Sequence, residues 1–280
     1  MDVVIEREPC YLLEAAELAY SLVNDIPAEK LSGTGLYCIP AEAIQRIRRE
    51  ACAGIESHQT ALDFYFRQVT VGAEGEEVSC LGSCMLYTAL KSFSSDAAQM
   101  CRELTQNWRA MRSRGLRITS ISDNSLNVEE QDAGGFSSLA QEMAELPVPQ
   151  SYRMQLLEVF SAFDRHLERV VELLRPIAAV LPDYMAPWTR QIPALAEQWD
   201  TFFQGNSAQE FFLQRARIQS GEFQELRLAF RFFSPYGSPG KFLGEKGRLL
   251  FHMGVNMQPG LGNAGQAQAP EEWELTALRL

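Results

Sequence analysis

The sequence lacks any long uninterrupted run of apolar residues. Charged residues or prolines break each apolar stretch well short of the roughly 20 residues that a membrane-spanning helix requires. The first eight residues, MDVVIERE, also lack the basic segment and the apolar run of a secretory signal peptide. We therefore expect no membrane span and a cytoplasmic location, in which the six cysteines stay reduced.

Positive charge is scarce. The chain has 25 lysines and arginines against 36 aspartates and glutamates, which gives a formal net charge of −11 at pH 7. Nucleic acids and anionic membranes are negatively charged and bind positively charged protein surfaces. We therefore do not expect the chain itself to bind DNA. The remaining composition, 46% hydrophobic and 22% charged over 280 residues, is typical of a globular protein that can bury a large core.

Recognised catalytic and phosphate-binding motifs are absent from the sequence. It contains no nucleophile elbow, P-loop, H-E-x-x-H pair or EF-hand loop, and its three histidines are not at metal-ligand spacing. Residues 260–265 match G-x-G-x-x-G, but a polar segment ending in Pro270 follows them and no βαβ pattern surrounds them. We interpret this motif as part of a linker. The sequence therefore assigns no catalytic residue and no cofactor.

The cysteines lack Cys-x-x-Cys spacing. Cys80 and Cys84 are four residues apart and could share one face of a helix. A third thiolate such as Cys101, supplied by a neighbouring helix, would complete a site for a soft metal or arsenic(III). Because free cysteine is a common buried small hydrophobe, we favour a role in the core and keep the metal site as an alternative.

Two stretches near the end of the chain alternate strictly between apolar and other residues. Their apolar positions are Leu226, Leu228, Phe230 and Phe232 in the first, and Leu249, Phe251, Met253, Val255 and Met257 in the second. This two-residue period predicts two half-buried strands. The glycine- and proline-rich connection favours a hairpin, and the short strand-like segment 2–7 could join it.

Helical spacing of apolar residues covers most of the remaining chain. The clearest helix begins after Ser94 or Ser95, carries Trp108 on its apolar face and can end at Gly115. The longest predicted helix spans 151–174, and the prolines after it predict a kinked or stepped region. We therefore predict an α+β, predominantly helical fold. Its small antiparallel sheet is formed by the C-terminal hairpin, with the N-terminal strand as a candidate member.

Aromatic residues crowd into the proline-containing region, between Tyr184 and Phe212. Packing against the sheet is the simpler interpretation, because aromatic side chains dominate ordinary cores. A hydrophobic pocket for a small-molecule effector is the alternative. The candidate pocket residues are Trp108, Tyr184, Trp188, Trp199, Arg231 and His252.

The composition changes abruptly after Met257. Residues 258–272 are rich in glycine, glutamine and alanine, which predicts a flexible linker. Residues 273–280 begin an amphipathic helix that the chain interrupts. We expect a helical sensor or effector domain over 1–257, followed by this linker and the truncated start of a further helix.

The last fifth of the chain resembles the enlarged ArsR-type (arsenic-repressor-like) winged-helix transcription regulators. The resemblance rests on the stretches LRLAFRFFSPY (226–236) and GRLLFHMGV (247–255), the linker and the helix start LTALRL (275–280). In that family a long amino-terminal effector domain precedes a winged-helix DNA-binding unit. The resemblance implies the ligand-sensing domain of a transcription regulator, with a small-molecule effector, a homodimer, and DNA contact only through a winged helix outside this chain.

The family's recognition helix and wing have no counterpart in these residues, so no DNA-contacting residue is assigned. Two other classes stay open, a small-molecule enzyme of unknown reaction and a helical protein-interaction module. A deep pocket with converging polar groups would favour the enzyme, whereas a broad apolar surface patch would favour the interaction module.

Overall fold

The computed structural model describes most of the chain between Asp2 and Pro259. The described ranges are 2–33, 35–71, 77–114, 117–122, 124–129, 138–215, 224–235, 240–243, 247–257 and residue 259. The predicted linker and the helix start at 273–280 lie outside these ranges, apart from Pro259. Within them helices predominate over short strands, which confirms the predicted α+β, predominantly helical fold. None of the described helices is both long and apolar enough to cross a membrane.

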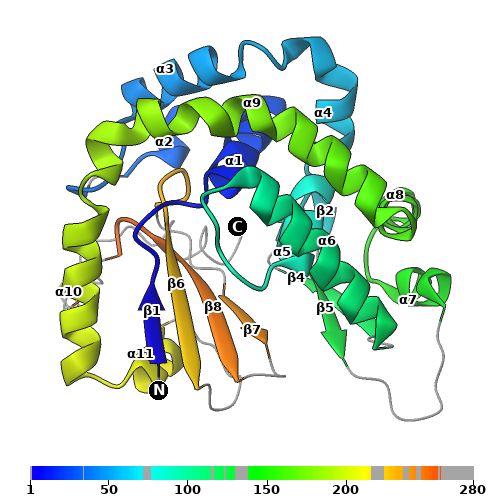
Figure 1. The fold of residues 1–280 in the computed structure, drawn as a ribbon. Helices are drawn as coiled ribbons and strands as arrows, with labels where there is room; N and C mark the ends of the chain where they lie inside the picture. The colour runs from blue at the N-terminus through cyan, green and yellow to red at the C-terminus, as the bar shows by residue number, and fades with distance from the viewer. Residues whose placement is uncertain are drawn as a thin grey trace.

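The helices are α1 (Tyr11–Val23), α2 (Ala28–Leu31), α3 (Ala41–Cys52), α4 (Gln59–Phe66), α5 (Leu81–Ala89), α6 (Ala97–Ser113), α7 (Leu139–Glu145), α8 (Gln150–Ser161), α9 (Phe163–Thr189), α10 (Ile192–Gly205) and α11 (Ala208–Arg215), with a 3₁₀ turn at Glu56–His58. The strands are β1 (Asp2–Ile5), β2 (Val69–Val71), β3 (Glu77–Ser79), β4 (Arg117–Ser122), β5 (Ser125–Glu129), β6 (Glu225–Arg231), β7 (Gly240–Leu243) and β8 (Arg248–Gly254). Figure 1 shows α9 arching over the molecule, with α10 descending beside the main sheet.

The main sheet has the strand order β1-β6-β8-β7. β1 pairs with β6 in parallel, so the first residues of the chain and the last described strands belong to one sheet. This confirms the predicted participation of the N-terminal strand. Two separate antiparallel pairs, β2–β3 and β4–β5, lie elsewhere in the fold.

The two alternating stretches form adjacent strands, but the predicted antiparallel hairpin between them is wrong. β6 and β8 run parallel, with Leu226 opposite Leu249 and Arg231 opposite Gly254. After β6 the chain first forms β7, at the edge of the sheet. It then returns to form β8, which lies between β6 and β7. The antiparallel partner of β8 is therefore β7, which lies inside the connection.

The predicted helix at 151–174 is two helices. α8 ends at Ser161, and Ala162 leaves the helical range with φ −123° and ψ 42° before α9 begins. α9 then continues through Pro176, Pro182 and Pro187, where we predicted kinks or steps. Each proline removes one backbone hydrogen bond, and α9 curves across the molecule without ending at any of them (Figure 1).

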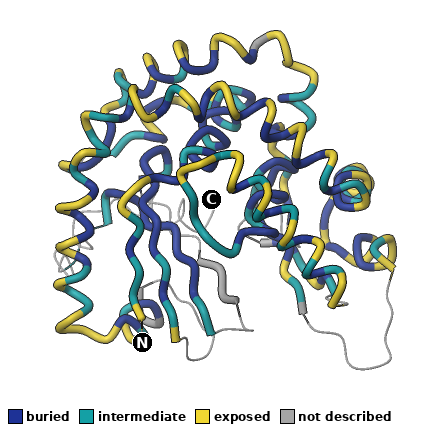
Figure 2. Tube along the Cα trace, viewed as in Figure 1, coloured by how far each residue is buried: buried dark blue, intermediate teal, exposed yellow. Residues whose placement is uncertain are grey.

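Helix α1 is the centre of the hydrophobic core. It contacts α9, α3, α4, α5 and α6, and Figure 2 shows it as largely buried. Most of its buried residues are alanine and leucine, whose small or flexible side chains permit close helix packing. Glu14 and Ser21 are the polar exceptions within this buried set.

Candidate functional site

The six residues predicted to line a ligand pocket occupy separate parts of the fold. Trp108 on α6 is buried against two phenylalanine rings of α8 and α9, with centroids 5.1 and 5.0 Å away. Trp199 on α10 is fully buried in an aromatic cluster of α10 and α11. Tyr184 and Trp188 are half-buried on the second half of α9.

The aromatic cluster of α10 and α11 packs against the main sheet. Phe212 of α11 and Phe251 of β8 have ring centroids 4.5 Å apart in an edge-on arrangement. Phe203 stacks on Trp199 at 5.5 Å. These contacts support the simpler interpretation of the crowded aromatic residues, which is core packing.

Arg231 and His252 are the two candidates that the structure brings together, through Tyr87 of α5. The Arg231 guanidinium donates a hydrogen bond from Nη1 to the Tyr87 hydroxyl. The Tyr87 ring lies edge-on to the His252 ring, with centroids 5.1 Å apart. Phe93 contacts the same imidazole at 4.9 Å, so His252 is enclosed by aromatic side chains.

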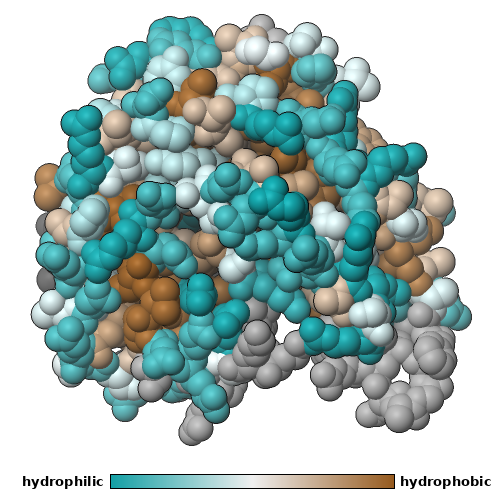
Figure 3. All heavy atoms as spheres, in the orientation of Figure 1, coloured by the Kyte–Doolittle hydropathy of each residue, from teal (hydrophilic) through white to brown (hydrophobic). Residues whose placement is uncertain are grey.

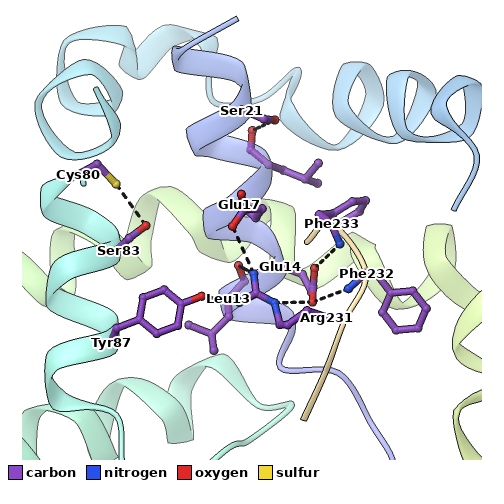
Figure 4. A network of polar contacts seen from close by, with 11 residues as sticks. Leu13, Glu14, Glu17, Ser21, Cys80, Ser83, Tyr87, Arg231, Phe232 and Phe233 are labelled. Carbon is purple, nitrogen blue, oxygen red and sulfur yellow. Dashed lines mark hydrogen bonds and ion pairs between the residues drawn. The ribbon is translucent and has the colours of Figure 1, made fainter. Parts of the chain in front are cut away.

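A buried ionic cluster, defined here as Glu14, Glu17, Tyr87 and Arg231, joins α1, α5 and β6 (Figure 4). Arg231 Nε donates to Glu14 Oε1 at 2.8 Å, and the two side chains are 3% and 0% exposed. Arg231 Nη2 also lies 3.5 Å from Glu17 Oε2. The guanidinium is therefore surrounded by acceptors on three sides.

Glu14 also fixes the backbone where the chain leaves β6. Its Oε1 accepts a hydrogen bond from the backbone N–H of Phe232, and its Oε2 accepts one from Phe233, each at 3.1 Å. Arg231 Nη2 donates in return to the carbonyl of Leu13 at 3.2 Å. Glu14 and Arg231 thus compensate each other's charge. They also form hydrogen bonds with backbone groups of α1 and of the segment after β6, as buried polar groups require.

The electrostatics of the buried ionic cluster favour a structural role. Burial raises the pKa of Tyr87 to about 12. Burial lowers the pKa of Arg231, but Tyr87 and the two carboxylates raise it by more, so the net shift is upward. Burial also raises the pKa of Glu17, which Arg231 only partly offsets. Arg231 and Tyr87 therefore keep their protons near neutral pH and are poorly suited to proton transfer.

A partial signal for the buried ionic cluster is present in the sequence. Glu14 and Glu17 are three residues apart on an otherwise apolar helix, so they share a face. The alternating pattern placed Arg231 on the polar face of its strand. In the fold, α1 covers that end of β6 and buries the arginine.

A second site, the arginine pocket, lies where four segments meet. These are the β1–α1 connection, the start of α6, the second half of α9 and the start of α10. The pocket has a volume of about 740 Å³, and Arg7, Arg175 and Arg190 are among its lining residues. Figure 3 shows the side of the molecule on which these segments meet, with hydrophobic side chains gathered below them over β1.

The arginines of the pocket differ in their partners. Arg7 Nη2 lies 3.2 Å from Asp200 Oδ2, and its Nη1 donates to the Pro193 carbonyl at 3.5 Å. In the described part of the chain, Arg175 and Arg190 form no ion pair. Arg175 and Arg190 are therefore exposed residues of the lining without a carboxylate partner among the described residues.

The hydroxyl groups of the pocket can supply hydrogen bonds. Tyr11 and Thr189 both line the pocket, and Thr189 lowers the pKa of the Tyr11 phenol. Burial is the main reason that the pKa of Tyr11 is raised, and Glu8 raises it further, so the phenol stays protonated at neutral pH.

None of the six residues predicted to line a ligand pocket lines this one. The sequence could not have paired Arg7 with Arg190, because only the fold brings their segments together.

The cysteines are all free thiols. Among the described residues, no three histidine, cysteine, aspartate or glutamate side chains come together to hold a metal ion. The alternative site of Cys80, Cys84 and Cys101 is therefore not formed among these residues. Burial raises the pKa of Cys80 to about 11, and its Sγ donates to Ser83 Oγ at 3.2 Å.

A third feature, the exit groove, lies on the other side of α10 and has a volume of about 620 Å³. Its lining residues are Ala194, Glu197, Gln198, Thr201, Phe202 and Pro259. Pro259 follows β8 in the chain by five residues and lines this groove together with residues of α10. Gln198 Nε2 additionally donates to the Tyr37 hydroxyl at 2.9 Å.

Comparisons with known proteins found no match for the chain. No protein-family model matches the chain, and no curated protein or solved structure matches it significantly. The resemblance to ArsR-type regulators therefore stays a prediction.

Proposed function

We propose that this chain is the ligand-sensing domain of a cytoplasmic transcription regulator of the ArsR-like type. In this proposal a small-molecule effector binds the arginine pocket, and a separate winged-helix unit contacts DNA. The net charge of −11 suits a sensor and is unfavourable for a phosphate backbone.

The position of α10 is the observation that carries the proposal. Pro193, in its first turn, lines the arginine pocket, and the next residue, Ala194, lines the exit groove that holds Pro259. The Arg7–Asp200 ion pair further ties the β1–α1 connection to α10. A ligand that changes the position of α10 would thereby change the path of the chain toward a downstream unit.

We also propose that the regulator acts as a homodimer. β1 is an edge strand of the main sheet, and its Val3 and Val4 are only half-buried. Hydrophobic side chains gather over this strand in Figure 3. Partly exposed apolar side chains on an edge strand support pairing with a second copy. The same patch favours the interaction-module alternative, so sedimentation of the purified chain distinguishes self-association from a monomer that needs another partner.

The test uses the full natural gene product and DNA from its own upstream region. Fluorescence anisotropy in low salt should show specific binding, and the affinity should change when the effector is added. The coding sequence after Leu280 should also specify a winged helix. Failure of the full product to bind DNA would overturn the regulator proposal and leave the enzyme and the interaction module as alternatives.

A further inference from the structure

We propose that the contact between Tyr65 and His166, here called the histidine switch, holds α4 against α9 while the imidazole is neutral and loosens when it is protonated. The Tyr65 hydroxyl lies 2.8 Å from Nδ1 of His166, and both residues are buried. Among the described residues, this is the one side-chain hydrogen bond that joins α4 to α9. The inference goes beyond the proposed function and does not depend on the arginine pocket.

The surroundings of the His166 ring leave it two polar contacts. Phe64 stacks on the ring with centroids 6.3 Å apart, and the Tyr65 ring lies edge-on at 6.0 Å. At the second ring nitrogen, Nη2 of Arg165 lies 3.5 Å from Nε2. The protonation state of the imidazole therefore has to suit a hydroxyl group at one nitrogen and a guanidinium group at the other.

A neutral imidazole suits both neighbours. One of its nitrogens accepts a hydrogen bond, and the donor is the Tyr65 hydroxyl or the Arg165 guanidinium, depending on the tautomer. A protonated imidazole has two N–H donors and no acceptor. Its Nε2–H would then face a guanidinium group, which has donors only, and the hydroxyl proton of Tyr65 would lose the imidazole as its acceptor. The geometry therefore disfavours the charged ring.

The charged groups around the pair act in the same direction. Burial is the main reason that the pKa of His166 is lowered, and Arg165 lowers it further. Glu158 of α8 is the acid that faces the ring, and its effect, which raises the pKa, is smaller than either of these. Arg169 faces Tyr65, but it is paired with Glu172 at 3.1 Å. Arg165 is therefore the cation that matters most for the switch.

The direction of the pKa shift makes the switch respond to acid. The ordinary pKa of histidine is 6.5, and the folded state binds the His166 proton less readily than the unfolded state does. The contribution of the neutral ring to stability is therefore present above pH 6.5. It is lost as the pH falls through the lowered pKa.

Other contacts of α4 limit the movement to a local one. The Phe66 carbonyl accepts a hydrogen bond from Asn24 Nδ2 at 2.8 Å, and Arg67 Nη1 donates to the Val23 carbonyl at 2.8 Å. Phe66 also packs closely on Gly82 of α5, where an added Cβ would lie 2.6 Å from its ring. These contacts do not involve a histidine. We therefore expect acid to loosen α4 from α9 while its far end stays attached to α1 and α5.

Hydrogen exchange of the whole chain, followed by mass spectrometry, tests the switch at about pH 7.5 and about pH 5, on either side of the histidine range. Rates are compared with those of unfolded peptides, since intrinsic exchange itself depends on pH. We expect α4 to lose protection at the lower pH. Helix α10, which lies far from α4 in Figure 1, should keep its protection. An NMR titration of the three histidines should give His166 an apparent pKa below 6.5.

Three variants separate the switch from an ordinary buried histidine. His166→Gln cannot take up a proton in this range, so its α4 should be equally protected at both pH values. Arg165→Gln removes the cation beside Nε2 and should raise the apparent pKa of His166. Tyr65→Phe removes the hydrogen bond, so its α4 should be less protected than that of the parent already at the higher pH. The matched control is His58→Gln, an exposed histidine just before α4, which should respond to acid as the parent does.

Several results would overturn the inference. One is equal protection of α4 at both pH values in the parent protein. Another is an acid response of His166→Gln as large as that of the parent. Loss of protection spread equally over α4 and α10 would show general acid destabilisation in place of a local switch. An unchanged pKa of His166 in Arg165→Gln would contradict the role of the guanidinium.

Discussion

Glu14 and Arg231 show how one buried pair can organise the meeting of a helix and a strand. The carboxylate accepts hydrogen bonds from Arg231 and from the backbone of Phe232 and Phe233, while the guanidinium reaches Leu13 and Tyr87. Such a pair gains little over a well-packed apolar substitute, yet removal of one partner leaves a buried charge without compensation. The pair therefore fixes the position of α1 on β6 more than it adds to stability.

Replacing Arg231 should be strongly destabilising. Arg231→Met removes the partner of a fully buried carboxylate, and we expect the free energy of unfolding to fall by about 3–5 kcal/mol. Urea unfolding followed by circular dichroism measures the change. Arg169→Met breaks an exposed pair and should cost less than about 1 kcal/mol. Equal effects of the two substitutions would contradict the structural role of Arg231.

Glu17 should make stability depend on pH. Burial raises its pKa above the ordinary value of 4.5, so the folded state holds this proton more tightly than the unfolded state. The protonated Glu17 side chain therefore favours the folded state. This contribution to stability is fully present below pH 4.5 and is lost as the pH rises through the raised pKa. Glu17→Gln cannot ionise, so its stability relative to the parent should increase between about pH 4 and pH 7 in urea unfolding.

Glu225 provides the opposite case as a control. Its hydrogen bond with Arg227 is the main reason that its pKa lies below the ordinary value, and Arg248 adds to the effect. Its contribution is therefore present above the ordinary pKa and is lost as the pH falls. The stability of Glu225→Gln relative to the parent should decrease as the pH rises. Parallel trends for the two variants would refute the assignment of Glu17.

At the scale of single elements, the end of β8 depends on one glycine. A Cβ at Gly254 would overlap the carbonyl oxygen of Pro235, which accepts the Asn256 N–H at 3.1 Å. Gly254→Ala should therefore displace the segment after β6 and cost roughly 1–3 kcal/mol, as overpacking does. Gly54→Ala is the control, because nothing lies within 4 Å of its added Cβ. A thermal shift equal to that of the control would contradict the close approach.

Sequence periodicity predicted the elements better than their connections. The helix that we expected after Ser94 or Ser95 is α6, although Asp96 is the residue that caps it. Alternation identified β6 and β8, but their direction depends on the route of the chain between them, on which local pattern carries no information. The prolines of α9 were overestimated as helix breaks, because the core contacts of a long amphipathic helix outweigh a few lost hydrogen bonds.

The candidate sites were less predictable than the helices. Arg231 and His252 belong to the two alternating stretches, and the fold brings both to Tyr87. The arginine pocket instead combines residues from four segments, and its arginines have no spacing that links Arg7 to Arg175 or Arg190. Only the fold brings the residues of such a site together. A single sequence therefore does not show which of them lie close to one another.

At the scale of the whole molecule, the main sheet connects the two ends of the described chain. β1 supplies one edge, and β6, β8 and β7 come from the last quarter, while the helices between them build the core around α1. α10 then lies between the arginine pocket and the exit groove. Each part of this arrangement packs against parts that are distant in the sequence. Disruption of the main sheet should therefore destabilise the whole described fold.

We therefore expect the described residues to unfold as one cooperative unit. Tryptophan fluorescence reports on Trp108, Trp188 and Trp199 among others, and far-ultraviolet circular dichroism reports on all helices, so the two urea transitions should coincide. Arg231→Met, which acts at the sheet, should move both midpoints equally. Arg169→Met should leave both near the parent value, since its pair is exposed. Two separated transitions, or a shift seen by one signal alone, would show that the helices and the sheet fold independently.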